Sequence, residues 1–459
     1  MNPENLPTLA FDRGTLVLSG ADRCFGEPFR WDGRTRQWRC HARHYCTVRR
    51  ELHGQVEDTL PRPEAIRWRH VTLPDLRSDQ LAALAAWEHV GRRGQIVMPT
   101  GTGKTVVALA AMAHCQAATL VVAPIRDLMY QWHRHILHTF GFNAGILGDG
   151  RHEIWPVTVT TYDSAYIHME RMGDRFALVV FDEEHHLPAP SLRQAGEFCA
   201  AEWRMGLTAT PERFDGQHVY LDELIGPVAY RQEILDARGT TLAEFQTVRI
   251  PVALGEGEQR RYDALSQEIR RFVSDRRKTH PGYRWEDVCK EAGQDPRARQ
   301  AMQAFHAKQV IENRAAEKLR VLEDLFRLHA HEPVLVFTGS NRMALDVSRR
   351  FLIPMIIDKT GKHERQGVLD GFQAGRLRAI VANQVLDEGI DVPAVKVGVI
   401  LGGFSSPRQA KQRLGRILRR SSGTTAVLYE VVCEETREVQ RSRTRRRSDA
   451  FAGTRHMRL

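Results

Sequence analysis

Short runs rich in apolar and β-branched residues alternate with longer amphipathic stretches along most of the chain. In the first half, such runs lie at 95–98, 119–123, 157–161 and 178–181. Between two of them, residues 127–140 have apolar positions at helical spacing. Continuous apolar runs are typical of strands that are buried on both faces of a sheet. The alternation therefore predicts an α/β domain in which helices cover a parallel sheet.

The pattern changes near residue 246 and returns after Pro333. Residues 262–272 and 297–330 have apolar positions at helical spacing among many basic residues, which predicts helices. We expect a helical insertion there, which either grips nucleic acid or acts as a spacer with solvated charges. Strand-like runs then resume at 334–337, 379–382, 397–401 and 426–432. The fold class is thus predicted as α/β, with two parallel-sheet domains separated by a helical insertion.

The segment up to about residue 70 differs from both halves. Residues 15–18 predict a strand, and 29–38 predict a hairpin because Asp32-Gly33 is a favoured two-residue turn. Arginines alternate there with Trp31 and Trp38. Such side chains either stack on bases and hold phosphates, or form the core of a small α/β domain.

Composition narrows the class of protein. The 459 residues are 42% hydrophobic and 27% charged, which allows large cores and about three domains. The longest apolar stretches fall short of the roughly 18 residues that a membrane span needs, and the first residues lack the pattern of a signal peptide. We therefore expect a cytoplasmic protein with no membrane partner. The net charge of +10 suits a polyanionic partner.

The seven cysteines are scattered, which argues against a disulfide framework. Cys24, Cys40 and Cys46 lie near histidines, so a zinc site is conceivable there, but their spacing fits no zinc-finger pattern.

The residues 98–105, Met-Pro-Thr-Gly-Thr-Gly-Lys-Thr, predict a phosphate-binding loop. Glycines let the backbone wrap a polyphosphate, the lysine places a charge among the phosphates, and the last threonine suits Mg²⁺. A strand-like run precedes the loop and a helix-compatible run follows it, as such a loop requires. The general pattern opens with Gly where this chain has Met98. The residues expected to bind ATP are Thr100, Gly101, Thr102, Gly103, Lys104 and Thr105.

The run at 178–181 ends in Asp182-Glu183-Glu184-His185-His186. Ligands of parallel sheets bind at the carboxyl ends of the strands. We expect Asp182 to hold Mg²⁺ and Glu183 to orient and polarise the attacking water. Together with the loop, this predicts ATP hydrolysis.

Three further features have weaker signals. Gln80, upstream of the loop, can read the adenine edge because its amide both donates and accepts. Thr208-Ala209-Thr210 can sense the γ-phosphate as a compact pair of hydroxyls. Beyond Glu434 the chain is rich in arginine, and such runs are commonly disordered arms that pair with phosphates.

The ordered set of motifs is more specific than any one of them. GTGKT, DEEH, TAT, DEGID and QRLGRILR occur in this order across the two halves. The chain thereby resembles the superfamily 2 helicases, and it looks most like the XPB family in its compact archaeal and bacterial form. The residues that carry this resemblance are 181–194, 206–216, 385–393 and 412–420. The hairpin region 31–45 resembles that family's damage-recognition domain more weakly.

The resemblance implies two RecA-like domains with ATP in the cleft between them, and ATP-driven 3′-to-5′ movement on DNA that opens duplex in repair. It implies that Arg416 and Arg419 reach the γ-phosphate from the second domain, with Gly389 and Asp391 also at the nucleotide. It assigns nucleic-acid contact or coupling to Thr208, Thr210, Arg213, Phe214, Asp215 and Gln412. Phe214 departs from the family, which has an acid at the middle of its Arg-Glu-Asp triplet.

The expected domains are 1–70 for damage recognition, 71–245 for the ATP-binding RecA-like domain, 246–325 for a thumb-like helical insertion, 326–435 for the second RecA-like domain and 436–459 for a basic tail. The expected partners are DNA at single-strand–duplex junctions and a nuclease, because relatives often work beside one. The alternatives are an ATPase that remodels nucleoprotein without separating strands, a nucleic-acid clamp, and an RNA motor.

Overall fold

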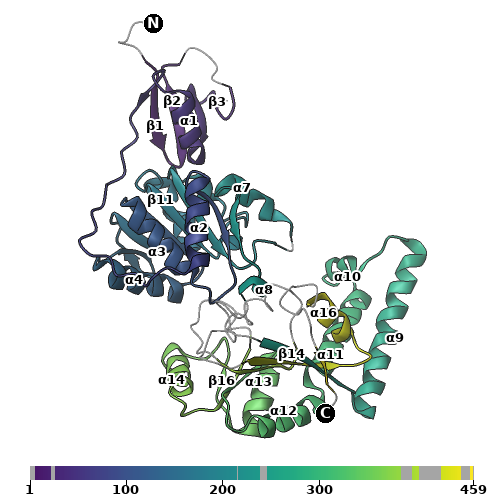
Figure 1. Ribbon diagram of the computed structural model, residues 1–459. Coiled ribbons are helices and arrows are strands. Elements are labelled where there is room, and N and C mark those ends of the chain that lie inside the picture. Colours follow the sequence, from purple (N-terminus) through teal and green to yellow (C-terminus); the bar gives the residue numbers. More distant parts are fainter. Residues whose placement is uncertain are drawn as a thin grey trace. The chain divides into compact units, whose positions relative to one another are not determined.

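Three sheets organise the part of the chain that the computed structural model describes, which is residues 6–21, 26–213, 215–237, 245–383, 395–402, 425–445 and 455–457 (Figure 1). The chain divides into two units, Met1–Glu233 and Ile234–Leu459. The first unit holds a small sheet and a large one, and the second unit holds the third sheet. In the described residues, no helix is both long and apolar enough to cross a bilayer.

The small N-terminal sheet has the strand order β3-β4-β2-β1-β5, and helix α1 (Tyr45–Glu51) packs against it. The predicted hairpin is present, but its connection spans 33–36, so it is longer than a two-residue turn. Trp31 remains 51% exposed while its ring lies 5.3 Å from that of Trp38. Trp38 thus packs on the core of the small domain, whereas Trp31 faces solvent and its stacking on bases stays a prediction. The strands are β1 (Thr8–Asp12), β2 (Thr15–Ser19), β3 (Arg30–Asp32), β4 (Gln37–His41) and β5 (Glu57–Asp58).

The large sheet of the first unit has the order β13-β6-β12-β11-β7-β10-β8-β9. Its strands pair in parallel except for the β8–β9 hairpin at one edge, as continuous apolar runs predict. The main helices are α2 (Ser78–His89), α3 (Lys104–Cys115), α4 (Arg126–Phe140) and α5 (Tyr162–Met172). The strands are β6 (Arg93–Val97), β7 (Thr119–Ala123), β8 (Gly145–Gly148), β9 (Arg151–His152), β10 (Val157–Thr161), β11 (Leu178–Asp182), β12 (Trp203–Thr208) and β13 (Val228–Arg231).

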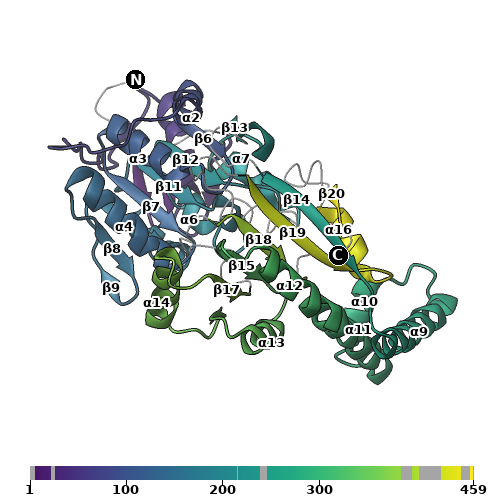
Figure 2. The ribbon, with the colours of Figure 1, turned by 60° about the horizontal axis from the view of Figure 1, so that its bottom comes forward.

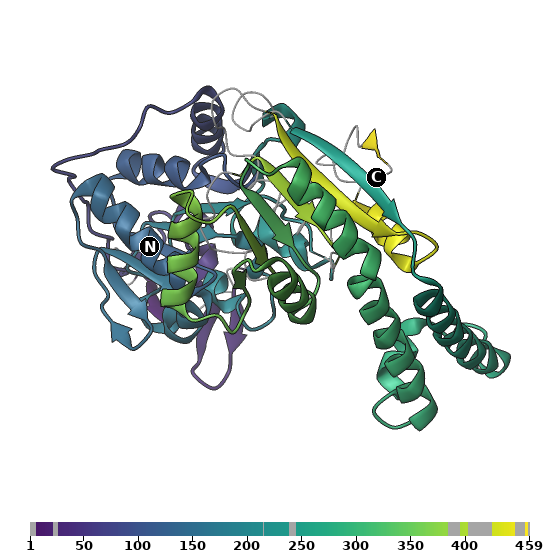
Figure 3. The same ribbon diagram turned by 90° about the horizontal axis from the view of Figure 1, so that it is seen from below.

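The sheet of the second unit has the order β16-β17-β15-β18-β19-β14-β20, and every pairing is parallel. Figure 3 shows its two long strands, β14 and β19, side by side. The covering helices are α12 (Ala316–Leu328), α13 (Asn341–Phe351) and α14 (Lys362–Gln373). The strands are β14 (Phe245–Val252), β15 (Val334–Phe337), β16 (Met355–Ile356), β17 (Ala379–Ala382), β18 (Val397–Ile400), β19 (Ala426–Cys433) and β20 (Arg455–His456).

The helical insertion is shorter than the expected 246–325. β14 pairs with β19 along its whole length, so residues 246–252 belong to the sheet. The insertion consists of α9 (Glu256–Thr279), α10 (Trp285–Glu291) and α11 (Pro296–Arg314), and Figure 2 shows α9 and α11 running beside each other. It has a small core of its own that includes Tyr283 and Val288, whereas α12 packs on the sheet.

The segment expected to be a separate basic arm is in part a structural element. Residues Arg437–Arg445 form helix α16, and Glu438 on it is buried. Its carboxylate pairs with Lys318 of α12 at 2.8 Å, and Ser442 donates to Glu430 of β19 at 2.8 Å. The many arginines suggested an exposed arm, whereas Glu438 and Ser442 attach the helix to α12 and to β19.

Candidate nucleotide-binding site

The phosphate loop lies between β6 and α3, as the sequence predicts, and two glycines set its shape. Gly101 and Gly103 have φ angles of 86° and 78°, the left-handed region that other residues rarely adopt. A Cβ on Gly103 would lie 2.5 Å from Nε2 of Gln80, so the close approach also requires glycine. The Thr102 hydroxyl donates to the Pro99 carbonyl at 2.7 Å, which closes the loop on itself.

Lys104 and Thr105 open helix α3. The Lys104 ammonium is 9% exposed and donates to the carbonyl oxygens of Met98 and Pro99 at 3.0 and 3.3 Å. The loop thus orients this charge with carbonyl oxygens of its own backbone. The Thr105 side chain is partly exposed one residue further along the helix.

Gln80 reaches the loop from helix α2, and its amide is engaged there. Oε1 accepts a hydrogen bond from the Arg77 backbone N–H at 3.1 Å, while Nε2 donates to the Thr102 carbonyl at 3.1 Å. In this structure Gln80 therefore supports the loop backbone. To bind the edge of an adenine, the Gln80 amide would have to give up its hydrogen bonds to Arg77 and Thr102.

Asp182 ends strand β11, and two aromatic side chains hold it. Trp132 of α4 donates its indole N–H to Oδ2 at 2.8 Å, and the Tyr162 hydroxyl donates to the Asp182 backbone carbonyl at 3.0 Å. Burial, followed by the neighbouring Glu183 charge, raises the pKa of Asp182 to about 6. The sequence pattern predicted only a helix around Trp132. A buried indole N–H normally needs a polar partner, and that was the available sign of this contact.

Glu183 follows in the left-handed conformation, at φ 49°, which turns the chain away from the sheet. Its Oε2 is buried and accepts no hydrogen bond within the described residues, and Nδ1 of His185 lies 3.4 Å away. This is the carboxylate expected to polarise water, and its Oε2 accepts no hydrogen bond among the described residues although His185 lies within ion-pair distance.

Glu184 was given no role by the sequence. Its side chain is fully buried, and neither carboxyl oxygen finds a hydrogen-bond partner in the described part of the chain. Burial, then the charges of Glu183 and Asp222, raise the pKa of Glu184 well above its ordinary value. Burial therefore favours the uncharged form of the Glu184 carboxyl group.

Thr208 connects the phosphate loop to the acidic loop. Its backbone carbonyl accepts from the Met98 N–H at 3.0 Å, and its hydroxyl lies 3.1 Å from Nδ1 of His185. The same hydroxyl accepts from the N–H of Thr210 at 3.1 Å. Thr208 therefore contacts both the phosphate loop and the acidic loop.

Arg213 is closer to this site than the family resemblance suggests. It makes two hydrogen bonds to the Asp215 carboxylate, at 2.9 and 2.6 Å, and a third to the His185 carbonyl at 2.6 Å. The arginine therefore ties the segment after Thr210 to the acidic loop. Phe214 between the two lies outside the described residues.

The remaining site residues expected from the second half also lie outside the described residues. These are Gly389, Asp391, Gln412, Arg416 and Arg419. Their contribution to a nucleotide site stays a prediction. Within the described residues, no group of three His, Cys, Asp or Glu side chains is arranged to hold a metal, and Cys24 of the conceivable zinc set lies outside them.

The residues of the first unit fit a nucleoside triphosphate with Mg²⁺. Left-handed glycines expose loop N–H groups, and Thr100 Oγ1, Glu183 Oε2 and Thr210 Oγ1 are buried polar atoms without hydrogen-bond partners in the described chain. Buried polar groups in native proteins are normally satisfied, so such a cluster indicates a ligand. Thr105 and Asp182 offer the oxygen ligands that Mg²⁺ prefers.

Comparison with known proteins agrees with this geometry. Residues 73–213 match the family described as type III restriction enzyme, res subunit, and residues 317–421 match the helicase conserved C-terminal domain. Residues 9–58 match the xeroderma pigmentosum group B helicase damage recognition domain. The chain is 37% identical over 439 residues to DNA 3′-5′ translocase XPB2 of the archaeon Sulfurisphaera tokodaii, covering 94% of this chain and 98% of that one.

The chain belongs to the XPB family of superfamily 2 DNA helicases. It is accordingly an ATP-hydrolysing enzyme that acts on DNA. DNA 3′-5′ helicase XPB of Kineococcus radiotolerans is 30% identical over 378 residues, and the match covers 79% of this chain and 61% of that relative. Among solved structures, the Hef helicase domain of Pyrococcus furiosus has the same fold, with a TM-score of 0.55 and 18% identity over 81% of this chain and 98% of that one.

Proposed function

We propose that this XPB-family protein uses ATP, with Mg²⁺, to move 3′ to 5′ along DNA and to open duplex DNA during repair. The observation that carries the proposal is the connection of the phosphate loop to the acidic loop through Thr208, in a chain with a matching damage-recognition domain. The direction is the one that the names of the archaeal and bacterial relatives state.

We assign the hydrolytic roles as follows. Lys104, oriented by two carbonyl oxygens, stabilises the negative charge of the β- and γ-phosphates. Glu183 accepts the proton of the attacking water through Oε2, which accepts no hydrogen bond among the described residues. Thr105 and Asp182 hold Mg²⁺, which neutralises phosphate charge, and Trp132 fixes the Asp182 carboxylate.

Arg416 and Arg419 complete the proposed site from the second unit, with Gly389 and Asp391. An arginine that reaches a transferring phosphoryl group is worth roughly 10³–10⁵ in rate. Gln412, Thr208, Thr210 and the Arg213–Asp215 segment are assigned to coupling hydrolysis to DNA. The hydrogen bond from Arg213 to the His185 carbonyl supports this coupling role for the segment.

A second function is a DNA-stimulated ATPase that remodels nucleoprotein or clamps DNA without separating strands. This function would follow if the acid of the family's Arg-Glu-Asp triplet guides a strand, because Phe214 replaces that acid here. As part of the first function, in repair, we also propose that the protein works with a partner nuclease.

Direction and strand separation are tested together. Streptavidin is bound to biotin at the 5′ or the 3′ end of single-stranded DNA, and its ATP-dependent release is timed. Movement from 3′ to 5′ predicts faster release from the 5′ end. In parallel, a duplex with a 3′ single-stranded tail reports strand separation. Directional release without strand separation supports the second function, and release that is equal at both ends with ATP contradicts the proposed direction.

A further inference from the structure

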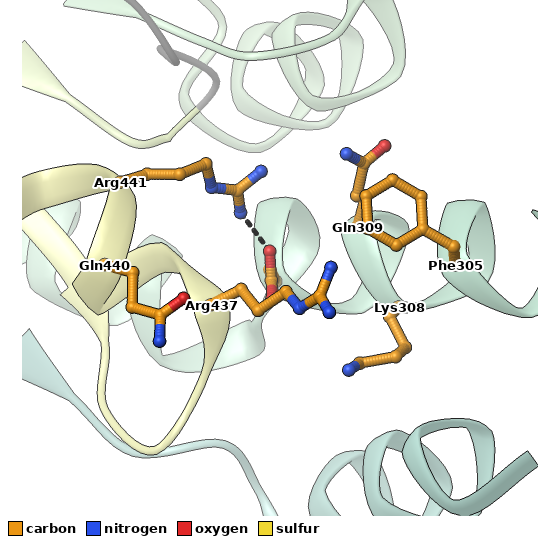
Figure 4. Close-up of a pocket in the computed structure, with 7 residues that line it drawn as sticks. Phe305, Lys308, Gln309, Arg437, Gln440 and Arg441 are labelled. Carbon is orange, nitrogen blue, oxygen red and sulfur yellow. Dashed lines mark hydrogen bonds and ion pairs between the residues drawn. The ribbon is translucent and has the colours of Figure 1, made fainter. Parts of the chain in front are cut away.

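A cationic pocket lies in the second unit, where helix α11 of the insertion meets helix α16. Its volume is about 400 Å³, within the range of about 300–1,000 Å³ that small-molecule sites occupy. Figure 4 shows the labelled side chains of α11 on one side and those of α16 on the other. The lining residues are Phe305, Lys308, Gln309, Glu312, Arg437, Gln440 and Arg441.

Lys308 is the unusual member of this lining. Its side chain is 7% exposed, yet no hydrogen bond to it occurs within the described residues, and its ammonium lies 4.3 Å from the centre of the Tyr262 ring. Burial, and then the charge of Arg437, lower its pKa. Its ammonium nitrogen is not among the fully buried polar atoms without partners in the described residues, so it can reach a ligand from the pocket.

Glu312 also lines the pocket, but its carboxyl oxygens are already engaged. Oε1 of Glu312 accepts from the Tyr262 hydroxyl at 2.8 Å, and Oε2 pairs with Arg441 (Figure 4). The ends of Lys308 and Arg437 instead face the same space. Two cations turned toward each other in a partly desolvated pocket repel, and an anion between them removes that repulsion.

An aromatic face lies beside this anion position. The Arg437 guanidinium carbon is 5.3 Å from the centre of the Phe305 ring, and Phe305 is partly exposed. Gln309 and Gln440 add side-chain amides, which can both donate and accept. A phosphate on the cations with a base against an aromatic ring is the usual way in which proteins hold a nucleotide of single-stranded nucleic acid.

We propose that this pocket binds one nucleotide unit, with its phosphate on Lys308 and Arg437 and its base against Phe305. The unit belongs either to a DNA strand or to a free nucleotide, and both present the same chemistry. The proposal does not rest on hydrolysis in the first unit, because every residue that it uses lies in the second.

The test measures binding of fluorescein-labelled dT12 by anisotropy without ATP, and of dTMP by calorimetry in a Lys104→Ala background, which weakens the other nucleotide site. Lys308→Met keeps the buried stem and removes the charge. Phe305→Leu removes the ring. Arg437→Gln changes an exposed residue, so it keeps the test informative if Lys308→Met fails to fold. The matched control is Lys278→Met, at an exposed lysine of the same insertion whose partner is Asp275.

We expect each pocket variant to bind dT12 about tenfold more weakly than the control. Weakening of dT12 alone identifies a DNA strand as the occupant, and weakening of dTMP as well identifies free nucleotide. If Lys308→Met and Arg437→Gln bind less tightly but Phe305→Leu does not, the site takes a bare phosphate and the nucleotide assignment is wrong. Unchanged binding of both probes by Arg437→Gln and Phe305→Leu overturns the proposal.

Discussion

Two buried lysines, one in each unit, have opposite surroundings. Lys318 is fully buried, and both oxygens of the Glu438 carboxylate lie within 2.9 Å of its ammonium, with the Leu401 carbonyl at 3.1 Å. Lys104 is 9% exposed, and backbone carbonyl oxygens of its own loop accept its hydrogen bonds. A carboxylate neutralises a buried charge, whereas carbonyl oxygens only orient it.

The comparison shows two uses of a buried lysine. The charge of Lys318 stabilises the fold, whereas the charge of Lys104 is available to a ligand. In the second unit, Lys318 attaches α12 to α16 across 120 residues of sequence. In the first unit, the loop has two left-handed glycines, and its buried Thr100 hydroxyl finds no hydrogen-bond partner among the described residues. Substitutions should therefore affect stability in one place and chemistry in the other.

The largest expected effect tests the chemical side. Glu183→Gln should keep ATP affinity yet lower the turnover rate by about 10²- to 10⁴-fold, because an amide cannot take the proton of the attacking water. Its matched control is Glu184→Gln, next to it in the chain. Glu184 has no assigned role in hydrolysis, and its carboxyl oxygens accept no hydrogen bond among the described residues, so this change should leave turnover near wild type. Stopped turnover together with lost ATP affinity in Glu183→Gln means that Glu183 is structural.

Lys318→Met tests whether the Lys318–Glu438 ion pair stabilises the second unit. It leaves the Glu438 carboxylate buried without its cation, and the free energy of unfolding should fall by about 3–5 kcal/mol in chemical denaturation. Replacing both members, as Lys318→Met with Glu438→Gln, should restore most of it. Lys278→Met, at an exposed ion pair, should have little effect. A double variant as unstable as the single one contradicts the view that the pair acts through charge.

Substitutions of Phe214, which lies between Arg213 and Asp215, test how this position acts on DNA. If its ring wedges between bases, Phe214→Ala should lose strand separation and keep DNA-stimulated ATPase activity. If the family's acid guides a strand, Phe214→Glu should gain strand separation. We expect the wedge, because arginine and aspartate still flank the position. Equal losses of all activities and of stability in both variants mean that Phe214 only packs.

The arginines beyond Glu434 have the smallest expected effect. A truncation after Glu434 would also remove Glu438 and leave Lys318 unpaired, so point changes are needed. Arg443 is exposed on α16, and Arg443→Gln should make the slope of log affinity against log salt shallower by about 0.9 on duplex DNA, since one phosphate contact is lost. An unchanged slope excludes Arg443 from DNA contact.

The sequence predicted what is encoded locally. The runs at 119–123 and 178–181 are strands of one parallel sheet, and the loop at 98–105 precedes a helix. It did not predict that 245–252 joins the second sheet, because the change of pattern near residue 246 suggested the start of the helical insertion. It also missed the Trp132–Asp182 and Lys318–Glu438 contacts, which join residues 50 and 120 positions apart. Such contacts depend on tertiary packing, which no local pattern records.

The most direct test of the central claim, that the first unit hydrolyses ATP in response to DNA, is steady-state turnover with single-stranded DNA, duplex DNA, RNA or no nucleic acid. Wild type should turn over slowly alone and at least about tenfold faster with DNA than with RNA. Lys104→Ala should lie about 10²- to 10³-fold lower under every condition while still binding DNA. Turnover near wild type in Lys104→Ala, or turnover that DNA does not change, would contradict the account.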